Sequence, residues 1–171
     1  MLFSEVIGQD PVKEKLILSH KDGRVSHAQL FFGPKGAGMW PLANAFAQYL
    51  TCENPTLIDS CGVCLSCKKN MKMVHPDVHY VFPVMTSKKH KTPKSFDYIA
   101  DWRRTALAHP YLDYNDWVEV IAETDTKQAT IMNEEVADII HKINLKAFEA
   151  PYKVIIIYFQ LLHSSVLAAK L

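Results

Sequence analysis

The sequence has no apolar run long enough to cross a membrane as a helix. Such a helix needs about 20 apolar residues, whereas the longest run here, Val154 to Phe159, has the length of a strand. The first residues, Met1 to Glu5, also lack the basic start and apolar core of a secretory signal. From these two absences we expect a cytoplasmic protein.

The chain also lacks an excess of charge of either sign. Its 19 Lys and Arg residues nearly balance its 18 Asp and Glu residues, for a formal net charge of +1. No overall field therefore recruits nucleic acid, and any contact with DNA would have to be local or made through partners. With 171 residues, 49% of them hydrophobic and 22% charged, the composition indicates one globular domain with room for an embedded module.

Cysteine is absent from most of the chain and concentrated within one short stretch. All four cysteines form a C-x8-C-x2-C-x2-C array: Cys52, Cys61, Cys64 and Cys67. Four thiolates at short spacing can close a tetrahedron around Zn²⁺ in a reducing compartment, where structural disulfides are rare. Because sulfur would fill every coordination position, no place remains for a catalytic water. The array therefore predicts a structural zinc module over residues 52–67.

The residues near the array bear on this prediction. Gly62 and Ser66 are turn-permissive and lie inside the two C-x2-C steps. The His-Pro-Asp sequence is expected to begin the following strand, and the alternative is that His75 replaces one cysteine ligand. Redox or disulfide chemistry and free thiols are the alternatives to a metal.

Residues 33–40 have the frame of a phosphate-binding loop without its two active side chains. In G-x-x-x-x-G-K-[ST] the lysine reaches the phosphates and the hydroxyl holds Mg²⁺. The segment here reads Gly33, Pro34, Lys35, Gly36, Ala37, Gly38, Met39, Trp40. A strand predicted over 29–32 and a helix over 42–50 supply the context that this motif requires. Met39 stands at the lysine position and Trp40 at the hydroxyl position.

The acidic residue that completes such a site is absent too. A buried parallel strand is predicted over 153–159, and in hydrolases of this class an acidic residue at its end holds Mg²⁺. Tyr158 and Phe159 occupy that position, followed by Gln160, Leu161 and Leu162. The joint loss predicts that the chain does not hydrolyse nucleotides. An alternative is a working ATPase in which Lys35 replaces the missing lysine.

The rest of the chain gives a coarse outline. Helices are expected over 10–23, where Asp10 would cap the start and Gly23 would end the helix, over 134–143, and from Ser164 onward. A strand is expected over 77–84, and an aromatic-rich segment over 102–117 is expected to pack as one or two short helices. Residues 87–94 form either a solvated loop or a phosphate-contacting patch. In the second case, together with Lys68, Lys69 and Lys72, the chain would be a zinc-ribbon nucleic-acid binder.

Several of these segments together resemble one family. The stretches 3–9, 27–34 and 152–157, with the cysteine array directly after the loop helix, are similar to the N-terminal ATPase-type domain of bacterial DNA polymerase III clamp loader subunits. The delta-prime type is most similar, and gamma/tau is a close relative. The resemblance covers all of the chain except about 86–127, which looks like an insertion.

The resemblance implies an α/β fold of the AAA+ P-loop class, with a parallel sheet flanked by helices and a protruding zinc module. Residues 1–171 would form part of such an AAA+ domain. It also implies a subunit that has no ATPase activity of its own and acts as a scaffold. Its partners would be gamma/tau and delta subunits in a hetero-pentamer, and this complex would place a sliding clamp on primed DNA. Gly8 and Gln9 match the segment near the adenine pocket. Because the loop lacks the lysine and the hydroxyl, we do not expect it to bind ATP and Mg²⁺.

The family continues through a sensor region, an arginine-finger segment, a helical lid and a collar, which this sequence does not contain. We therefore expect a fragment, either a cloned N-terminal domain or a truncated product.

Overall fold

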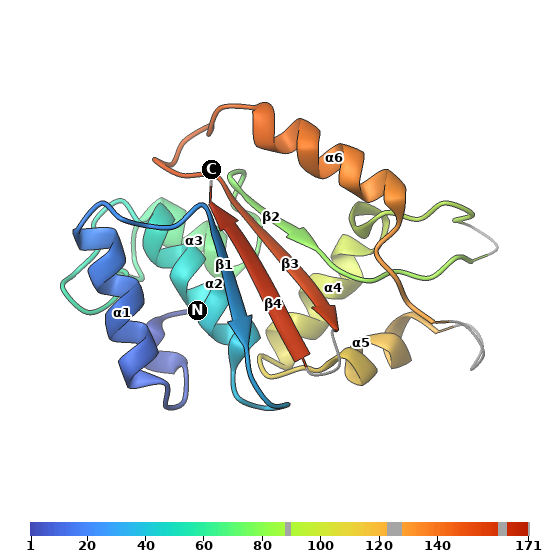
Figure 1. Ribbon diagram of the computed structural model, residues 1–171, viewed down its shortest axis with the longest axis horizontal. Coiled ribbons are helices and arrows are strands. Elements are labelled where there is room, and N and C mark those ends of the chain that lie inside the picture. Colours follow the sequence, from blue (N-terminus) through green and yellow to red (C-terminus); the bar gives the residue numbers. More distant parts are fainter. Residues whose placement is uncertain (88–89, 123–127, 161–163, 171) are drawn as a thin grey trace.

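The computed structural model describes residues 1–87, 90–122, 128–160 and 164–170, with the backbone alone for 159, 160 and 164–170. Its centre is a sheet of four strands in the order β1-β4-β3-β2 (Figure 1). The strands are β1 (Ala28–Phe32), β2 (Val78–Val81), β3 (Val154–Gln160) and β4 (Ser164–Lys170). Within this described part, none of the helices has the length and apolarity that a membrane crossing requires.

The sheet is mixed. β2 and β3 pair in parallel with Val78 opposite Val154, as the buried run at 154–159 predicts. β4 is antiparallel to both of its neighbours, with Leu167 opposite Leu30 of β1 and Ile157 of β3. The prediction of a parallel sheet is therefore confirmed for the pair β2 and β3 and wrong at β4.

The helix expected from Ser164 onward is also wrong, because this segment is strand β4. The run Ser-Ser-Val-Leu-Ala-Ala-Lys contains good helix formers, which explains the expectation. In the fold, however, the segment pairs with β1 on one side and β3 on the other along its whole length. Two ladders of backbone hydrogen bonds outweigh a weak local preference.

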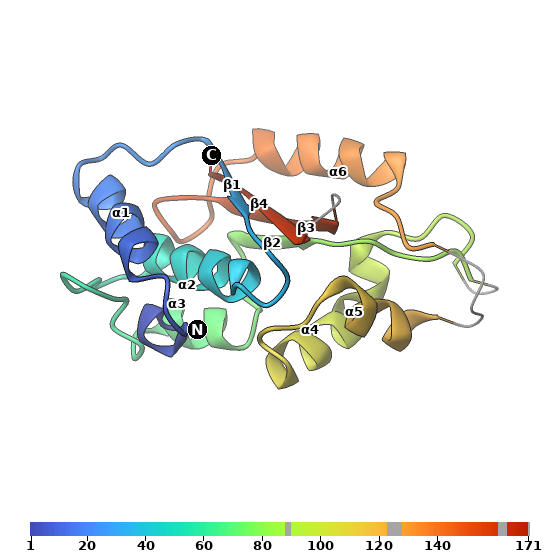
Figure 2. The same cartoon turned by 60° about the horizontal axis from the view of Figure 1, so that its bottom comes forward.

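Helices cover both faces of the sheet (Figure 2). One face carries a layer of five α-helices and the other carries α6 (Asn133–Asn144). The five are α1 (Asp10–Lys21), α2 (Met39–Thr51), α3 (Leu65–Met71), α4 (Ile99–Ala108) and α5 (Tyr114–Ile121), and two short 3-10 turns, η1 (Phe3–Glu5) and η2 (Ser95–Tyr98), lie beside them. α2 lies under the sheet and is buried at every position but Asn44, so its sequence is apolar nearly all round.

Helix α1 begins and ends close to the predicted positions. Pro11 lies in its first turn and Gly23, with φ of +66°, follows its end. The N-cap is Gln9 in the left-handed region, and no side chain makes a capping hydrogen bond. The prediction that Asp10 caps the helix is therefore wrong, because Asp10 is already the first helical residue.

The strand predicted over 77–84 is shorter than expected. β2 ends at Val81, and Pro83, which has no backbone N–H, follows shortly after. Val84 instead forms an isolated antiparallel bridge with Thr130.

The aromatic-rich segment supplies much of the core, as expected. Trp102 of α4 and Trp117 of α5 are both fully buried. The Trp102 ring stacks on Phe82 with centroids 4.2 Å apart, and Trp117 meets Trp102 edge-on at 4.9 Å. The Trp117 indole N–H donates to the carbonyl of Pro83. Residues 123–127 of the proposed insertion lie outside the described part of the chain.

Candidate metal centre and phosphate loop remnant

The four cysteine sulfurs converge on one point. All lie within 4.8 Å of one another, at the junction between the end of α2 and the start of α3. Cys52 is the C-cap of α2 and Cys64 the N-cap of α3. Gly62, with φ of +71°, makes the turn between Cys61 and Cys64, as the spacing predicts.

The sulfur separations suit a tetrahedral metal. Cys52 lies 3.6 Å from Cys61, 4.0 Å from Cys64 and 3.6 Å from Cys67, and Cys61 lies 3.9 Å from Cys67. Zinc–sulfur bonds of about 2.3 Å at tetrahedral angles put sulfurs about 3.8 Å apart. A disulfide would need about 2.05 Å, and all four cysteines are unpaired. The four cysteines therefore lie close enough to hold a metal ion.

Backbone N–H groups already point at three of these sulfurs. Cys61, Cys64 and Cys67 donate to the sulfurs of Cys52, Cys61 and Cys64, at 3.3–3.4 Å. Hydrogen bonds from the backbone N–H groups of Val63 and Cys64 lower the pKa of Cys61 to about 6. Burial instead raises the pKa of Cys67 and of Cys52. A bound cation would supply the charge that keeps all four sulfurs deprotonated.

Ser66 has a different role from the turn residue that the spacing suggests. It lies inside α3, where its hydroxyl donates to the carbonyl of Thr51 at 2.5 Å and its N–H donates to Glu53. Asn70 completes the junction by donating to the Thr51 hydroxyl at 2.8 Å. These buried bonds fix the end of α2 against α3 and so place the four sulfurs.

His75 does not join the cluster. Its Nδ1 accepts the backbone N–H of Asp77 at 3.1 Å, and its Nε2 lies 3.2 Å from a carboxylate oxygen of Glu149. The side chain precedes β2, which agrees with the prediction that His-Pro-Asp introduces a strand. Burial lowers the pKa of His75.

The glycine loop has the predicted context, between β1 and the N-terminus of α2. Gly36 (φ +80°) and Gly38 (φ +82°) adopt left-handed backbone conformations that favour glycine. The N–H of Ala37 donates to the carbonyl of Pro34 at 3.1 Å, so this donor is used within the loop. Pro41, in the first turn of α2, has no N–H to offer. Pro41 is a third change directly after Met39 and Trp40, just beyond the last position of the motif, and was not predicted to affect the loop.

Met39 and Trp40 are core residues. A Cβ atom added at Gly33 would lie 2.9 Å from the sulfur of Met39, so the methionine packs directly over the first glycine of the frame. The Trp40 ring lies 5.0 Å from Trp102 and 5.7 Å from Tyr158, measured between centroids. In an active loop, position 40 and the end of β3 would hold Mg²⁺ together. Here the two positions hold aromatic rings in contact with each other.

Lys35 is engaged by an acidic partner. Its ammonium forms an ion pair with Asp113, the N-cap of α5. The hydrogen bond and charge of Asp113 raise the pKa of Lys35. Burial by itself would raise the pKa of Asp113, but Lys35 and the N–H groups of Asp116 and Asn115 hold it below its usual value. A phosphate approaching Lys35 would have to compete with this carboxylate.

The segment before α5 closes one side of the loop. The Tyr111 hydroxyl accepts the N–H of Ile7 at 2.7 Å, and a Cβ atom at Gly38 would lie 3.2 Å from the Tyr111 ring. The hollow between the loop and residues 111–113 has a volume of about 20 Å³. That is room for about one water molecule and too little for a phosphate group.

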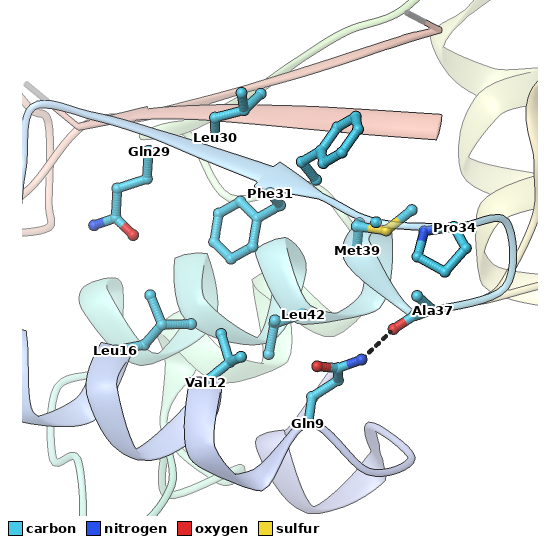
Figure 3. Close-up of a pocket in the computed structure, with 12 residues that line it drawn as sticks. Gln9, Val12, Leu16, Gln29, Leu30, Phe31, Pro34, Ala37, Met39 and Leu42 are labelled. Atoms are coloured by element: carbon cyan, nitrogen blue, oxygen red, sulfur yellow. Dashed lines mark hydrogen bonds between the residues drawn. The ribbon is translucent and has the colours of Figure 1, made fainter. Parts of the chain in front are cut away.

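A larger cavity of about 460 Å³ lies on the other side of the loop, between α1, β1 and the start of α2 (Figure 3). Gln9 lines it and donates from its side-chain amide to the carbonyl of Ala37 at 3.0 Å. Most of the wall is apolar, with Val12, Leu16 and Leu42 on the helices. Of the predicted loop residues, Gly33, Pro34, Ala37 and Met39 reach this cavity. Gly8, with φ of +64°, precedes Gln9 and is not among its lining residues.

The lysines proposed to contact phosphate are partly neutralised. Lys69 pairs with Glu149, and Lys94 pairs with both carboxylate oxygens of Asp138 at 2.9 and 3.0 Å. Lys68 and Lys72 are exposed. Lys88 and Lys89 lie outside the described residues. The hypothesis that residues 87–94 contact phosphate is weakened at Lys94, because Asp138 balances the charge of this lysine.

Comparison with known proteins identifies the family. The family described as "DNA polymerase III, delta subunit" matches residues 8–160, most of the chain. The chain therefore belongs to this family and to the clamp loader subunits of DNA polymerase III.

Curated relatives match a shorter stretch. The gamma/tau subunit of DNA polymerase III from Mycobacterium tuberculosis is 42% identical over 65 residues, which are 38% of this chain and 11% of the relative. The tau subunit from Escherichia coli is 37% identical over 67 residues, 39% of the chain and 10% of the relative. The Arabidopsis thaliana protein STICHEL-like 1 is 39% identical over 72 residues, 42% of the chain and 6% of the relative. The chain thus aligns with about a tenth or less of the length of these relatives.

Proposed function

We propose that the chain is a delta-prime-type subunit that serves the clamp loader as a scaffold without hydrolysing ATP. The observation that carries this proposal is the contact between Trp40 and Tyr158, with ring centroids 5.7 Å apart. It places two core aromatic rings where an active enzyme would bind Mg²⁺. Met39 at the lysine position and Pro41 beside it remove a phosphate charge partner and a backbone donor as well.

In this proposal the subunit works within a larger assembly in the cytoplasm. Its partners are gamma/tau and delta subunits in a five-membered ring, which opens a sliding clamp and places it on primed DNA. The family match supports membership of such a complex. The packing of the loop, with the Tyr111 ring against Gly38 and the Met39 side chain against Gly33, suits a scaffold that does not bind nucleotide.

We further propose that Zn²⁺ is the metal of the four-cysteine cluster and that its role is structural. Four sulfur ligands at separations of 3.6–4.0 Å suit zinc and leave no position for substrate. Zinc would then hold the end of α2 and the start of α3 in one orientation.

The assembly role is tested by reconstitution. Clamp loading on primed DNA is measured with a complete ring and with a ring from which this subunit alone is omitted. We expect the incomplete ring to lose loading, and adding the chain back to restore it. Equal loading with and without the subunit would refute the scaffold role.

The loss of nucleotide binding is tested separately by thermal unfolding with millimolar Mg-ADP or Mg-ATP. A ligand at about 100 times its dissociation constant would stabilise the fold by about 2.7 kcal/mol, a shift of several degrees. We expect no shift. A gamma/tau-like ATP-binding subunit is the second candidate, favoured by the names of the curated relatives. A clear shift that Lys35→Ala abolishes would support that candidate instead.

A further inference from the structure

A second groove lies at the opposite edge of the sheet from the glycine loop. It runs beside β2, the strand at the far end of the order β1-β4-β3-β2, and has a volume of about 260 Å³. Its walls include Arg103 of α4 and Lys142 of α6. These two helices lie on opposite faces of the sheet (Figure 2). The groove is thus a gap between the layers that the edge strand leaves open.

The polar side chains of this groove are basic or titratable. They are His75, His79, Arg103 and Lys142, together with the phenol of Tyr80, and none of the described residues that line the groove has a carboxylate. Burial, together with the charges of Lys142 and Lys153, lowers the pKa of His79 to about 4, so its ring is neutral at pH 7. A chain with a net charge of +1 thus places two cationic side chains, Arg103 and Lys142, and two histidines at one cavity.

The nearest carboxylates bond to groups outside the groove, but they keep their negative charge, and Asp77 favours the charged form of His79. Asp77 accepts three backbone N–H groups, from Phe148, Glu149 and Ala150 at 2.5–2.9 Å. Glu149 is paired with Lys69. On α6, Asp138, one turn before Lys142, holds Lys94 with both oxygens.

The donors are held in place by the fold. The Arg103 Nε donates to the carbonyl of Met73 at 2.8 Å, which orients the guanidinium and leaves its terminal nitrogens for another acceptor. The Nε2 of His75 is buried and makes no hydrogen bond among the described residues, although Glu149 lies 3.2 Å away. Because Nδ1 of His75 accepts a backbone N–H, the ring proton of the neutral form lies on Nε2. An oriented guanidinium is the group best suited to a phosphate.

The remaining wall is apolar and partly aromatic. Phe96 of η2 is 77% exposed, and Tyr80 and Ile99 lie in the same groove. A cavity of this volume falls just below the range of about 300–1,000 Å³ for typical ligand sites. It therefore suits a ligand with one anionic group and a small apolar body.

We propose that this groove binds a small phosphate monoester, with its phosphate between Arg103, Lys142 and His79 and its apolar part against Phe96. The site is separate from the glycine loop and does not depend on the proposed scaffold role. Phosphate oxygens can accept from all three side chains, and binding would place an anion next to an uncharged histidine.

The test follows the imidazole signals of His79 by NMR, with inorganic phosphate or phenyl phosphate added at constant ionic strength. Bound phosphate favours the charged imidazole, so we expect the pKa of His79 to rise from about 4. Phenyl phosphate should bind more tightly than inorganic phosphate because of its ring. Lys142→Gln should weaken binding about tenfold, the factor for one lost charge-assisted hydrogen bond.

The control is Lys15→Gln, which makes the same charge change at an exposed position on α1. Arg103→Gln provides a second variant, and its fold is checked by thermal unfolding because Arg103 also bonds Met73. An absent response of His79, or equal weakening by Lys142→Gln and Lys15→Gln, would overturn the proposal. A phosphorylated ten-residue oligonucleotide that binds more tightly than phenyl phosphate, with strong salt dependence, would overturn the assignment to a small ligand.

Discussion

At the residue scale, three buried charged side chains bind backbone groups in loops and at the ends of helices. Glu135, Asp77 and Lys153 are 1%, 1% and 5% exposed. Glu135 accepts the N–H of Ser95 at 2.6 Å, and the Lys153 ammonium donates to the carbonyls of Lys142 and Leu145 at the end of α6. A buried charge is costly unless it is bonded, so these residues are sensitive positions.

Glu135→Ala should lower the free energy of unfolding by about 1–3 kcal/mol, because it leaves the buried N–H of Ser95 without an acceptor. The neighbouring exposed residue gives a matched control, since Glu134→Ala should change stability by no more than about 0.5 kcal/mol. Urea unfolding of both variants measures the difference. Equal effects would show that the Ser95 bond contributes nothing.

Asp77→Asn should destabilise the chain by about 1.5–3 kcal/mol at pH 7, through weaker bonds to the N–H groups of residues 148–150. Burial opposes ionisation, but these N–H groups hold the pKa of Asp77 below its ordinary value of 3.8. The carboxylate therefore stabilises the fold fully above that value and loses its effect as the pH falls through the lower folded pKa.

The measurement is urea unfolding at pH 7 and pH 3. The difference in the free energy of unfolding between the wild-type chain and Asp77→Asn should narrow at the lower pH. Exposed Asp22→Asn is the control and should change stability at pH 7 by no more than about 0.5 kcal/mol. A gap that stays constant between the two pH values would contradict the assignment.

At the element scale, helix ends decide the position of the metal ligands. α2 ends at Thr51, and the next residue, Cys52, is its C-cap. α3 starts after Cys64, whose sulfur accepts the N–H of Cys67 at 3.4 Å. Because the two ends are joined by Ser66 and Asn70, the sulfurs approach one another without a disulfide.

We expect the chain to bind one zinc ion and its melting temperature to fall when the zinc is removed by a chelator. Cys64→Ser removes a ligand and should lower the affinity for zinc by more than about 10- to 100-fold, which is the loss typical for residues that only hydrogen-bond to a ligand. Ser66→Ala is the matched variant, which keeps four sulfurs but loses the bond to Thr51. It should cost about 1 kcal/mol of stability and still bind one zinc. Zinc content by elemental analysis distinguishes the cases, and a zinc-free chain with unchanged stability would refute a structural role.

At the scale of the whole molecule, β4 joins two parts of the sheet. It lies between β1, which leads to the glycine loop, and the parallel pair β3 and β2. Its removal would expose the edges of β1 and β3 together. The orientation of the loop relative to the aromatic core thus depends on the last described strand.

Leu167→Pro should destabilise the chain strongly, because residue 167 lies at the middle of β4, opposite Leu30 and Ile157. Proline removes a ladder hydrogen bond and is tolerated in sheets mainly at edges and at the first residue of a strand. Ser164→Pro, at that first residue, should be much milder. Thermal unfolding compares the two, and equal melting temperatures would show that β4 does not pair as described.

Much of the site could be predicted from the sequence because its signals are local. The spacing of the four cysteines and the two glycines predicted where a metal-binding cluster and a loop remnant would lie. The structure brings the four sulfurs together and places the glycine loop between β1 and α2. The sequence also shows that Met39, Trp40 and Tyr158 replace the lysine, the hydroxyl residue and the acidic residue of an active site. Their mutual contact was not visible, because Trp40 and Tyr158 are more than 100 residues apart in the chain.

Local signals in the sequence were enough to predict the helices with clear boundaries, the buried strand at 154–159 and the cluster of four cysteines, since each depends on neighbouring residues. Only the tertiary structure decided that 164–170 is a strand, that Asp113 pairs with Lys35 and that Tyr111 closes the loop. Local preference for helix at 164–170 is weak, a few tenths of a kcal/mol per residue. Two neighbouring strands with unpaired backbone groups outweigh it, and such partners come from distant parts of the chain.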